Sequence, residues 1–290
     1  MLSYGRFLRD KFGCRVYKVG IDAGFSCPNR DGSLSTAGCA YCNGGSFRPK
    51  TSDRIKPIEQ QITEGIEYLR RRYGAGKFIA YFQSATNTYA PLEILAPLYE
   101  LAISHTDIVG LAIGTRPDCI DEEKLDWLQR LAKKYFVTIE YGLQSASNET
   151  LFRINRGHDV LSWRNAVAMT RGRGIYIGTH LILGFPWESR EETLSGAQVI
   201  SEARIDFLKL HHLHIVRGSS LAEEYMNRPF HLPNMEEYAN LAADFIERMD
   251  PKIYIERLFA TAPTDQLIAP VWGKSKAEIQ RFIELVINER

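Results

Sequence analysis

The sequence predicts an α/β protein built on an open, partial (β/α)6 barrel, with a C-terminal α/β extension packed on it. Short apolar runs rich in β-branched and aromatic residues alternate with helical stretches of about 10–15 residues, which is the pattern of βαβ units and a parallel sheet. Six such strands occur in a row, too few for a closed eight-strand barrel. Small and polar residues follow the strands, where (β/α) folds carry their catalytic groups.

The expected elements alternate regularly along the chain. Runs with strand character span residues 15–23, 77–83, 107–115, 136–144, 176–184 and 207–216. Stretches with apolar residues at helical spacing lie between them, at residues 58–73, 91–104, 122–134, 160–172 and 189–203. Each of these helices would therefore connect two parallel strands.

The pattern changes after about residue 217. A helix is expected in MEEYANLAADFIERM, a strand in IYIERLFA and a final helix in KAEIQRFIELVINER. No Gly/Ser-rich linker precedes this segment. We therefore expect residues 1–217 to form the barrel with a basic N-terminal segment, and residues 218–290 to be an extension that is not independent.

Composition and charge restrict the class of protein. A hydrophobic fraction of 44% with 24% charged residues is ordinary for a soluble globular chain. We expect a cytoplasmic protein without membrane contact, because no apolar run approaches the roughly 18 residues of a membrane helix and the opening MLSYGRFLRDKFG lacks the apolar region of a signal peptide. Residues 1–77 hold 14 basic and 7 acidic side chains. This excess suits contact with phosphates, but a solvated helix face ending in Arg70, Arg71 and Arg72 explains it equally well.

The residues that follow the strands point to one site. Cys27 to Cys42 follow the first strand, residues 84–86 the second, residues 115–118 the third, Gln144 the fourth and residues 184–186 the fifth. The carboxyl ends of parallel strands meet at the same edge of a sheet, so these segments are expected to lie together.

Three of the five cysteines form the motif Cys27-x11-Cys39-x2-Cys42. Soft thiolates select zinc or an iron–sulfur cluster. A structural zinc takes four ligands, but no second C-x2-C or H-x3–5-H follows, and the first strand separates Cys14 from the loop. Three thiolates suit a [4Fe–4S] cluster with one iron open to another ligand. Structural zinc remains the alternative, and Cys14 and Cys119 are expected to be buried thiols.

The cysteine loop, with Tyr41 just before its last cysteine, resembles that of the radical S-adenosylmethionine (SAM) superfamily. The fuller pattern CPNRDG…GC-x-YC resembles the Elongator catalytic-subunit-like branch, and within it small stand-alone bacterial proteins. The likeness runs from Gly13 to the RLFATAP…PVWGKSK segment. The loop is spaced differently from the commonest C-x3-C-x2-C motif, so the assignment rests on several motifs together.

The resemblance implies that the chain binds SAM as well as the cluster. Tyr41 lies beside the cluster ligands. Ser84 and Thr86 would line the amine of SAM, although Ser84 and Ala85 stand where relatives have glycine. Gly184, in the run LILGFP, would help to shape the adenine pocket.

Two runs, EYGLQS at 140–145 and NRGH at 155–158, are the most specific part of the likeness. By that likeness, Gln144 would bind the ribose and Arg156 would pair with the carboxylate of SAM, which the arginine fork matches. Glu140 lies on the same strand face as Gln144 and would reach the ribose or the amine.

Three other segments have roles that the sequence leaves open. The run TRPD at 115–118 also matches the branch, whereas Gly114 stands where some relatives have Glu, and His180 where relatives often have an acid. His211 and His212 are neighbours and face opposite sides of a strand. We expect His212 and His214 to face the barrel lumen, although packing histidines are an equal alternative.

The implied activity is reductive cleavage of SAM at the cluster, which makes a 5′-deoxyadenosyl radical that takes hydrogen from the substrate. The implied substrate is a tRNA wobble uridine. An electron donor such as flavodoxin or ferredoxin is expected, and so is a second modifying enzyme, because no acetyltransferase, TRAM-like or cobalamin domain fits into 290 residues. The alternatives are a radical SAM enzyme for a small molecule, like the coproporphyrinogen-oxidising relatives, and a zinc-stabilised binding module without catalysis.

Overall fold

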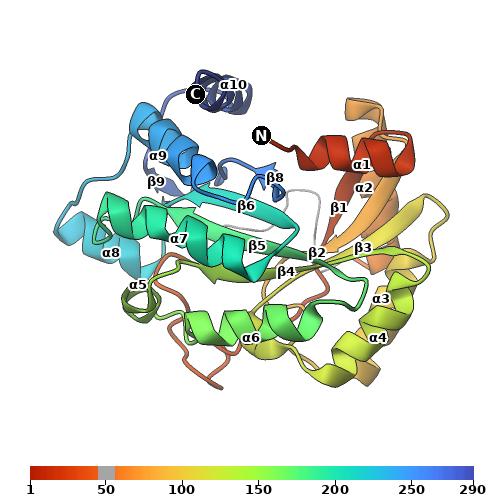
Figure 1. Cartoon of the computed structure of the whole chain (residues 1–290). Coiled ribbons are helices and arrows are strands. Elements are labelled where there is room, and N and C mark those ends of the chain that lie inside the picture. The colour runs from red at the N-terminus through yellow and green to blue at the C-terminus, as the bar shows by residue number, and fades with distance from the viewer. Residues whose placement is uncertain (45–55) are drawn as a thin grey trace.

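The computed structural model describes residues 1–44 and 56–290. Its centre is a curved sheet with the strand order β1-β2-β3-β4-β5-β6-β8, and all neighbouring strands in it are parallel (Figure 1). These strands are β1 (Val16–Ile21), β2 (Lys77–Phe82), β3 (Ile108–Thr115), β4 (Phe136–Gln144), β5 (Tyr176–Leu183), β6 (Phe207–His212) and β8 (Tyr254–Arg257). β1 and β8 are the two edges, so the sheet is a half-barrel, and the predicted fold class is confirmed.

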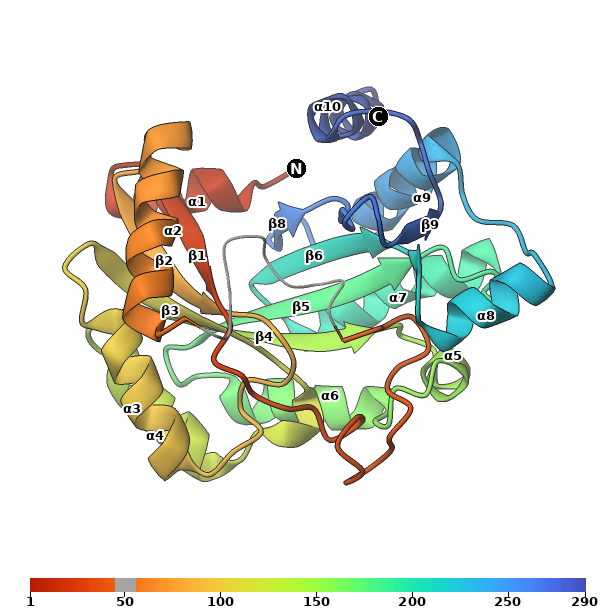
Figure 2. The same cartoon turned by 180° about the vertical axis from the view of Figure 1, so that it is seen from behind.

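Helices cover the outer face of the sheet (Figure 2). Those that connect consecutive strands are α2 (Ile58–Tyr73), α3 (Leu92–Ile103), α4 (Glu122–Ala132), α5 (Asn148–Arg153), α6 (Val160–Thr170) and α7 (Arg190–Ala203). Side-chain caps fix where several of them begin. Ser189 accepts a hydrogen bond from the Glu192 N–H, and the Glu192 carboxylate accepts one from the Ser189 N–H, which is a complete capping box at α7.

The C-terminal segment contributes a strand to the barrel. After α8 (Ser220–Asn227) and α9 (Met235–Glu247), strand β8 pairs with β6 and becomes the seventh strand of the sheet. The chain ends with β9 (Leu267–Ala269) and α10 (Lys276–Asn288). The expected sixth strand at 207–216 is broken, since β7 (Ile215–Val216) leaves the sheet and pairs antiparallel with β9.

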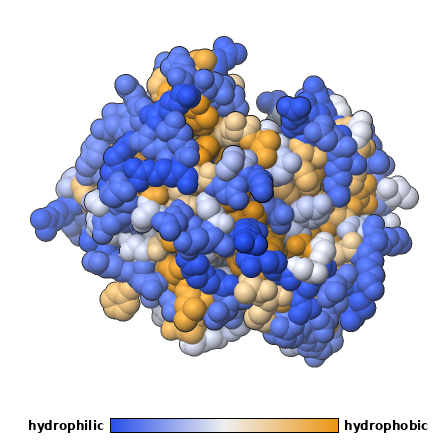
Figure 3. Space-filling view, viewed as in Figure 1, coloured by the Kyte–Doolittle hydropathy of each residue, from blue (hydrophilic) through white to orange (hydrophobic). Residues whose placement is uncertain are grey.

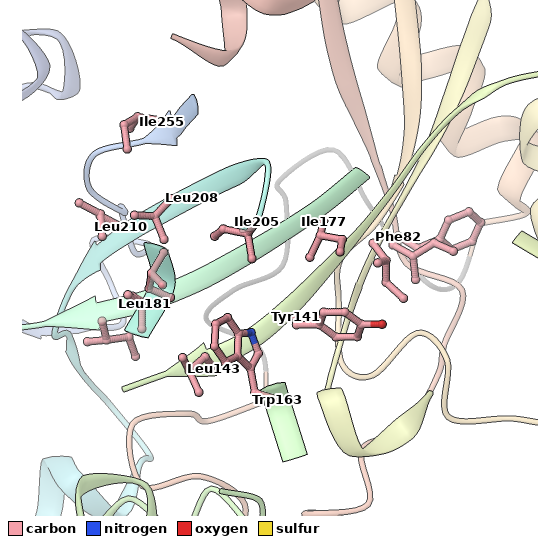
Figure 4. Packing of buried hydrophobic residues seen from close by; sticks show 14 of the residues in the cluster. Phe82, Tyr141, Leu143, Trp163, Ile177, Leu181, Ile205, Leu208, Leu210 and Ile255 are labelled. Carbon is pink, nitrogen blue, oxygen red and sulfur yellow. The ribbon is translucent and has the colours of Figure 1, made fainter. Parts of the chain in front are cut away.

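The larger hydrophobic core lies between the sheet and its helices. Outward-facing strand residues such as Tyr141, Leu143 and Ile177 are buried against helix residues such as Trp163 (Figure 4). The Trp163 indole N–H donates to the Thr179 hydroxyl at 3.1 Å, so this large side chain is buried with its polar atom satisfied.

A smaller core closes the amino ends of the strands. Helix α1 (Tyr4–Phe12) places Phe7 against four aromatic side chains, each of which is the first residue of its strand: Phe136, Tyr176, Phe207 and Tyr254. The Ile255 N–H donates to the Leu2 carbonyl at 2.9 Å, which ties the start of the chain to β8. This floor leaves the carboxyl ends as the open side of the half-barrel.

Among the described residues, no helix combines the length and the apolar character that crossing a bilayer requires.

Candidate functional site

The cysteine loop after β1 folds around an arginine. Two loop glycines, Gly38 and Gly44, have positive φ, and a Cβ on either would lie 3.0 Å from the Arg30 guanidinium. Only glycine takes this backbone shape with so little room, so both positions let the loop wrap the side chain. The guanidinium donates to the Cys42 carbonyl. Arg30 therefore fixes the path of the chain from Cys39 to Cys42.

The loop is docked on the segment after α5. The Ala40 N–H donates to the Ile154 carbonyl at 2.8 Å, and the Asn155 amide donates to the Gly38 carbonyl at 2.8 Å. The Asn29 amide donates to the Asn155 carbonyl. These bonds explain why the NRGH run and the cysteine loop act together, since each fixes the backbone of the other.

Arg156 lies beside Cys39 as a result. Its Nη1 donates to the Cys39 sulfur at 3.6 Å, and its Nη2 donates to the Gly142 carbonyl at 2.6 Å. Burial opposes ionisation of the Cys39 thiol, but the Arg156 charge and the hydrogen bonds from Arg156 and Asn29 outweigh it and lower the pKa of this thiol. The site therefore favours the thiolate form that a metal cluster binds.

The other two thiols have different surroundings. The Gly44 N–H donates to the Cys42 sulfur at 3.3 Å. Burial raises the pKa of the Cys42 thiol in spite of that bond. Cys27, at the start of the loop, lies near enough to Cys119 for its thiolate charge to contribute to the raised pKa of Cys119, about 12, after burial and Asp118. Cys14 precedes β1 and lies at the opposite ends of the strands.

The residues of the loop fit an iron–sulfur cluster. Within residues 1–44 and 56–290, no three His, Cys, Asp or Glu side chains converge as ligands of a single metal ion would. Hydrogen bonds to the sulfurs are part of how proteins hold such clusters, and Cys39 and Cys42 both accept them here.

The expected SAM-binding residues of β4 lie next to this loop. Gly142 has no side chain because a Cβ there would lie 2.5 Å from the Gln144 amide and 2.9 Å from the Arg156 guanidinium. The glycine thus lets both side chains meet over the strand. Arg156 is buried, and its Nε has no hydrogen-bond partner among the described residues. A buried donor without a partner is costly, so this atom is suited to a ligand.

The segment after β2 is held against the end of β3. The Asn87 amide donates to the Gly114 carbonyl at 2.7 Å, and the Thr86 N–H donates to the Ser26 carbonyl at 3.2 Å, next to Cys27. The Ser84 hydroxyl is buried and has no partner in the part of the chain that the structure describes. Ser84 and Thr86 therefore border the start of the cysteine loop.

The TRPD run at 115–118 fixes the backbone of Arg156 through hydrogen bonds. Arg116 is 2% exposed and forms two hydrogen bonds with the Asp118 carboxylate, at 2.9 and 2.8 Å. Its Nη1 donates to the Arg156 carbonyl at 2.8 Å. Asp118 thus orients Arg116, and Arg116 fixes the backbone that carries Arg156.

Two further predicted residues are placed differently. Gly184 has a φ of 90° and follows β5, where a Cβ would lie 2.9 Å from the Pro233 ring. Tyr41 is buried in the large core, and burial and the Cys39 charge raise the pKa of its phenol. Arg48, Lys50 and Arg54, three of the basic residues near the loop, lie outside the described residues.

Glu140 is the centre of a buried charge network that sequence reasoning missed. Its carboxylate accepts hydrogen bonds from Lys18, Lys209, Tyr81 and His180. Burial alone would raise the pKa of Glu140, but the Lys18 and Lys209 charges hold it well below its usual range. A signal was present, because each lysine interrupts an apolar strand, in VYKVGI and FLKLHH. Lysine at such a position faces either solvent or a partner.

The expectation that His212 and His214 face the lumen is wrong for His212, the one of the two that belongs to β6. Alternation along β6 places Lys209 and His211 on the inner face, and His211 contacts Arg257 there. His212 faces outward, where it stacks on Trp272 with ring centroids 4.1 Å apart, and its Nε2 lies 2.8 Å from that of His214. His212 is therefore a packing histidine, and His214 is buried beside it.

Two family models match most of this chain. Residues 27–196 match the family model described as Radical SAM superfamily, and residues 205–288 match the Radical_SAM C-terminal domain. Protein YhcC of Escherichia coli (strain K12) is 35% identical over 285 residues, which cover 97% of this chain and 91% of that protein.

Two more distant matches are to proteins that are longer than this chain. The tRNA uridine(34) acetyltransferase of Methanocaldococcus infernus is 28% identical over 147 residues, or 50% of this chain and 27% of that enzyme. The solved structure of Methanocaldococcus infernus Elp3 with an N-terminal deletion superposes with a TM-score of 0.70 at 18% identity, over 94% of this chain and 63% of that one. The second match shows the shared fold.

Proposed function

Because this chain belongs to the radical SAM superfamily, we propose that it uses a [4Fe–4S] cluster and SAM to modify a tRNA nucleobase, the wobble uridine. Family membership makes it an enzyme and assigns these two cofactors, and it sets aside a zinc-stabilised binding module. When bound, the reduced cluster supplies the electron that splits SAM into methionine and a 5′-deoxyadenosyl radical, which takes a hydrogen atom from the substrate. The protein supplies the ligands, the pocket and the exclusion of water.

Cys27, Cys39 and Cys42 would hold the cluster at the carboxyl ends of the strands. The lowered pKa of Cys39 supports this role, because only the thiolate is a good ligand. The N–H donors of Arg156, Asn29 and Gly44 would then lie against bound sulfur.

The environment of Arg156 is the observation that best supports a SAM pocket. Its guanidinium is buried beside a cluster ligand and has an unpartnered Nε, so a carboxylate placed there would fill an open donor position and pair with a buried charge. Gln144, across Gly142, would reach the ribose, and the buried Ser84 hydroxyl would accept from the amine. Thr86 and Gly184 would border the same pocket.

The buried network has a different role from the one expected for Glu140. The Glu140 carboxylate already accepts hydrogen bonds from Lys18, Lys209, Tyr81 and His180. We therefore propose that Glu140 organises the lumen next to SAM and does not bind SAM itself. Gly178 makes room for this side chain, since a Cβ there would lie 3.0 Å from the Glu140 Cγ.

Support for tRNA as substrate comes from the relatives. Enzymes named tRNA uridine(34) acetyltransferase match 50% or more of this chain, yet the match covers only 27% to 38% of the two enzymes compared. The part they share with this chain would be the radical SAM part, and a second enzyme would supply the rest of the reaction. The basic residues of the first third are consistent with RNA binding.

Mass spectrometry of bulk tRNA nucleosides tests this proposal. We expect one modified uridine to disappear from cells that lack the gene, and to return with the wild-type gene but not with Cys39→Ala. Cys14→Ala is the matched control and should restore it. An unchanged nucleoside profile would instead favour the alternative, a radical SAM enzyme that acts on a small molecule.

A further inference from the structure

A cavity of about 430 Å³ opens on the side of the half-barrel, between its two edge strands. It is lined by the start of the chain, by the inner faces of β1, β2 and β6, by residues 255–259 and by α10. The molecular surface is notched between the parts that carry α1 and α10 (Figure 3). Residues at the strand centres, Lys18, Tyr81 and Lys209, form its inner wall.

The buried charges of this wall do not balance. Lys18 and Lys209 each pair with both Glu140 and Glu256, at distances of 3.0 Å or less. These pairs match two cations with two carboxylates. Arg257 is a third cation on the same wall and has no carboxylate partner among the residues that the structure describes.

Arg257 also has unused donor capacity. Its guanidinium contacts His211, and its Nε is buried without a hydrogen-bond partner. Burial and the Arg257 charge hold the pKa of His211 well below its usual range, and burial and Lys209 lower that of His180 to about 4. Both rings are therefore neutral at pH 7, and the wall keeps one excess positive charge. An unbalanced buried charge is unfavourable unless a counter-ion arrives.

We propose that this cavity binds the carboxylate or phosphate group of a small molecule, with Arg257 as the main contact. The guanidinium fork matches either oxyanion. On the cavity rim α10 places both Lys276 and Glu284, whose charges offset each other, so Arg257 is the uncompensated cation of this cavity among the described residues. The volume lies in the range of small-molecule sites and is too small for a folded RNA strand. The occupant is thus a small acid, separate from any macromolecular substrate.

The position of the cavity connects it to the site above. Gln83 lines it and directly precedes Ser84 of the expected SAM pocket. Along β4, Glu140 lies two residues below Gly142, a separation of about 6.6 Å at the rise of a strand. A small acid bound at Arg257 would therefore lie beside SAM and on the lumen side of it. The site is defined by the charges of the wall, so it does not depend on tRNA being the substrate.

The test measures anion binding to the full chain that carries its cluster, saturated with SAM and without reductant. Ligand-observed NMR follows 13C-acetate, and the 31P signal follows inorganic phosphate. Binding of at least one anion is expected, and Arg257→Gln should weaken it at least tenfold, because a charge-assisted hydrogen bond contributes about 1.5–3 kcal/mol. Arg164→Gln, at an outer-surface arginine paired with Glu202, is the matched control and should change nothing.

Two further variants keep the test decisive if Arg257→Gln does not fold. Glu256→Gln raises the excess charge and should tighten binding, whereas Lys276→Gln, on the exposed rim, should weaken it severalfold. The ratio of acetate to phosphate affinity identifies which oxyanion the site prefers. Absence of binding, or binding unchanged in both Arg257→Gln and Lys276→Gln, would overturn the proposal.

Discussion

The contact between Arg156 and Cys39 shows how single residues build this site. The guanidinium lowers the pKa of the thiol, and the backbone of Arg156 is fixed by Arg116. Asp118 in turn orients Arg116 through two hydrogen bonds. Motifs that are far apart in the sequence, after β1, β3 and α5, therefore depend on one another for their geometry.

The role of each cysteine can be tested by its iron. We expect the anaerobically purified protein to be brown, with about four irons per chain, as a cubane cluster implies. Alanine at Cys27, Cys39 or Cys42 should remove colour and iron, because each supplies one thiolate. Alanine at Cys14 or Cys119 should preserve both. Iron retained in a Cys39→Ala protein would show that the ligand set is different.

Arg156 should matter more for SAM than for the cluster. Arg156→Ala is expected to weaken SAM binding by at least about 1.5–3 kcal/mol, the contribution of a charge-assisted hydrogen bond, while most of the iron remains. Equilibrium binding of SAM, with iron measured on the same sample, checks this. The exposed Arg164→Ala is the control. Normal SAM affinity in Arg156→Ala would mean that another residue holds the carboxylate.

At the scale of elements, helix α1 determines which end of the half-barrel is open. Phe7 packs against aromatic residues that begin β4, β5, β6 and β8, so one helix closes the amino ends of four strands. Only the carboxyl ends of the strands and the lateral cavity therefore remain open, among the described residues, to substrate and cofactors.

Removing the Phe7 ring should therefore destabilise the whole sheet. Phe7→Ala is expected to lower the free energy of unfolding by about 3 kcal/mol, at the low end for a core phenylalanine because Phe7 is only partly buried. Denaturant unfolding followed by circular dichroism measures this. Phe152→Ala, at a side chain that is 89% exposed, should have no effect. Equal stability of the two variants would show that α1 is not a structural floor.

The elements themselves were largely predictable from periodicity, and the exceptions have physical causes. The expected strands at 77–83 and 136–144 match β2 and β4 within a residue, because apolar runs of that length suit a sheet covered by helices. Helix α1 was missed because its buried face is aromatic and short. The break after His212 was missed because Leu213 and His214 continue the apolar pattern although the chain leaves the sheet.

The candidate site was predictable where it depends on local motifs and not where it depends on pairing between distant strands. The cysteine spacing and the NRGH run identify their segments from sequence alone. The link from Lys18 to Glu140 joins β1 to β4 across the lumen, and no local pattern contains it. The position of Arg257 in the lumen could not be predicted, because the sequence pattern did not show that β8 pairs with β6.

At the scale of the whole molecule, neutral buried histidines should make the fold sensitive to acid. Burial, as the leading cause, lowers the pKa of His180 and of His214 to about 4. Below about pH 6.5 the unfolded chain binds protons that the folded chain does not, so stability is lost as pH falls. Each such histidine should contribute a loss of about 2 kcal/mol by pH 5.

Substitution of one histidine isolates this effect. Between pH 6.5 and pH 5, the unfolding free energy of His214→Gln should decrease less steeply than that of the wild type, because the glutamine does not titrate. The difference between the two slopes should correspond to about one proton per molecule. Denaturant unfolding of both proteins at several pH values measures the slope, and all shared titrations cancel. Parallel pH profiles would show that His214 binds protons equally in the folded and the unfolded chain, so that folding does not lower its pKa.

The central proposal is that this chain takes a hydrogen atom from tRNA by means of SAM. The most direct measurement incubates the anaerobic protein with SAM, a strong reductant and tRNA whose nucleosides are deuterated, and determines the mass of the 5′-deoxyadenosine formed. The account predicts that tRNA stimulates formation of this product and that deuterium enters it. Production of unlabelled 5′-deoxyadenosine at the same rate with and without tRNA would contradict the claim.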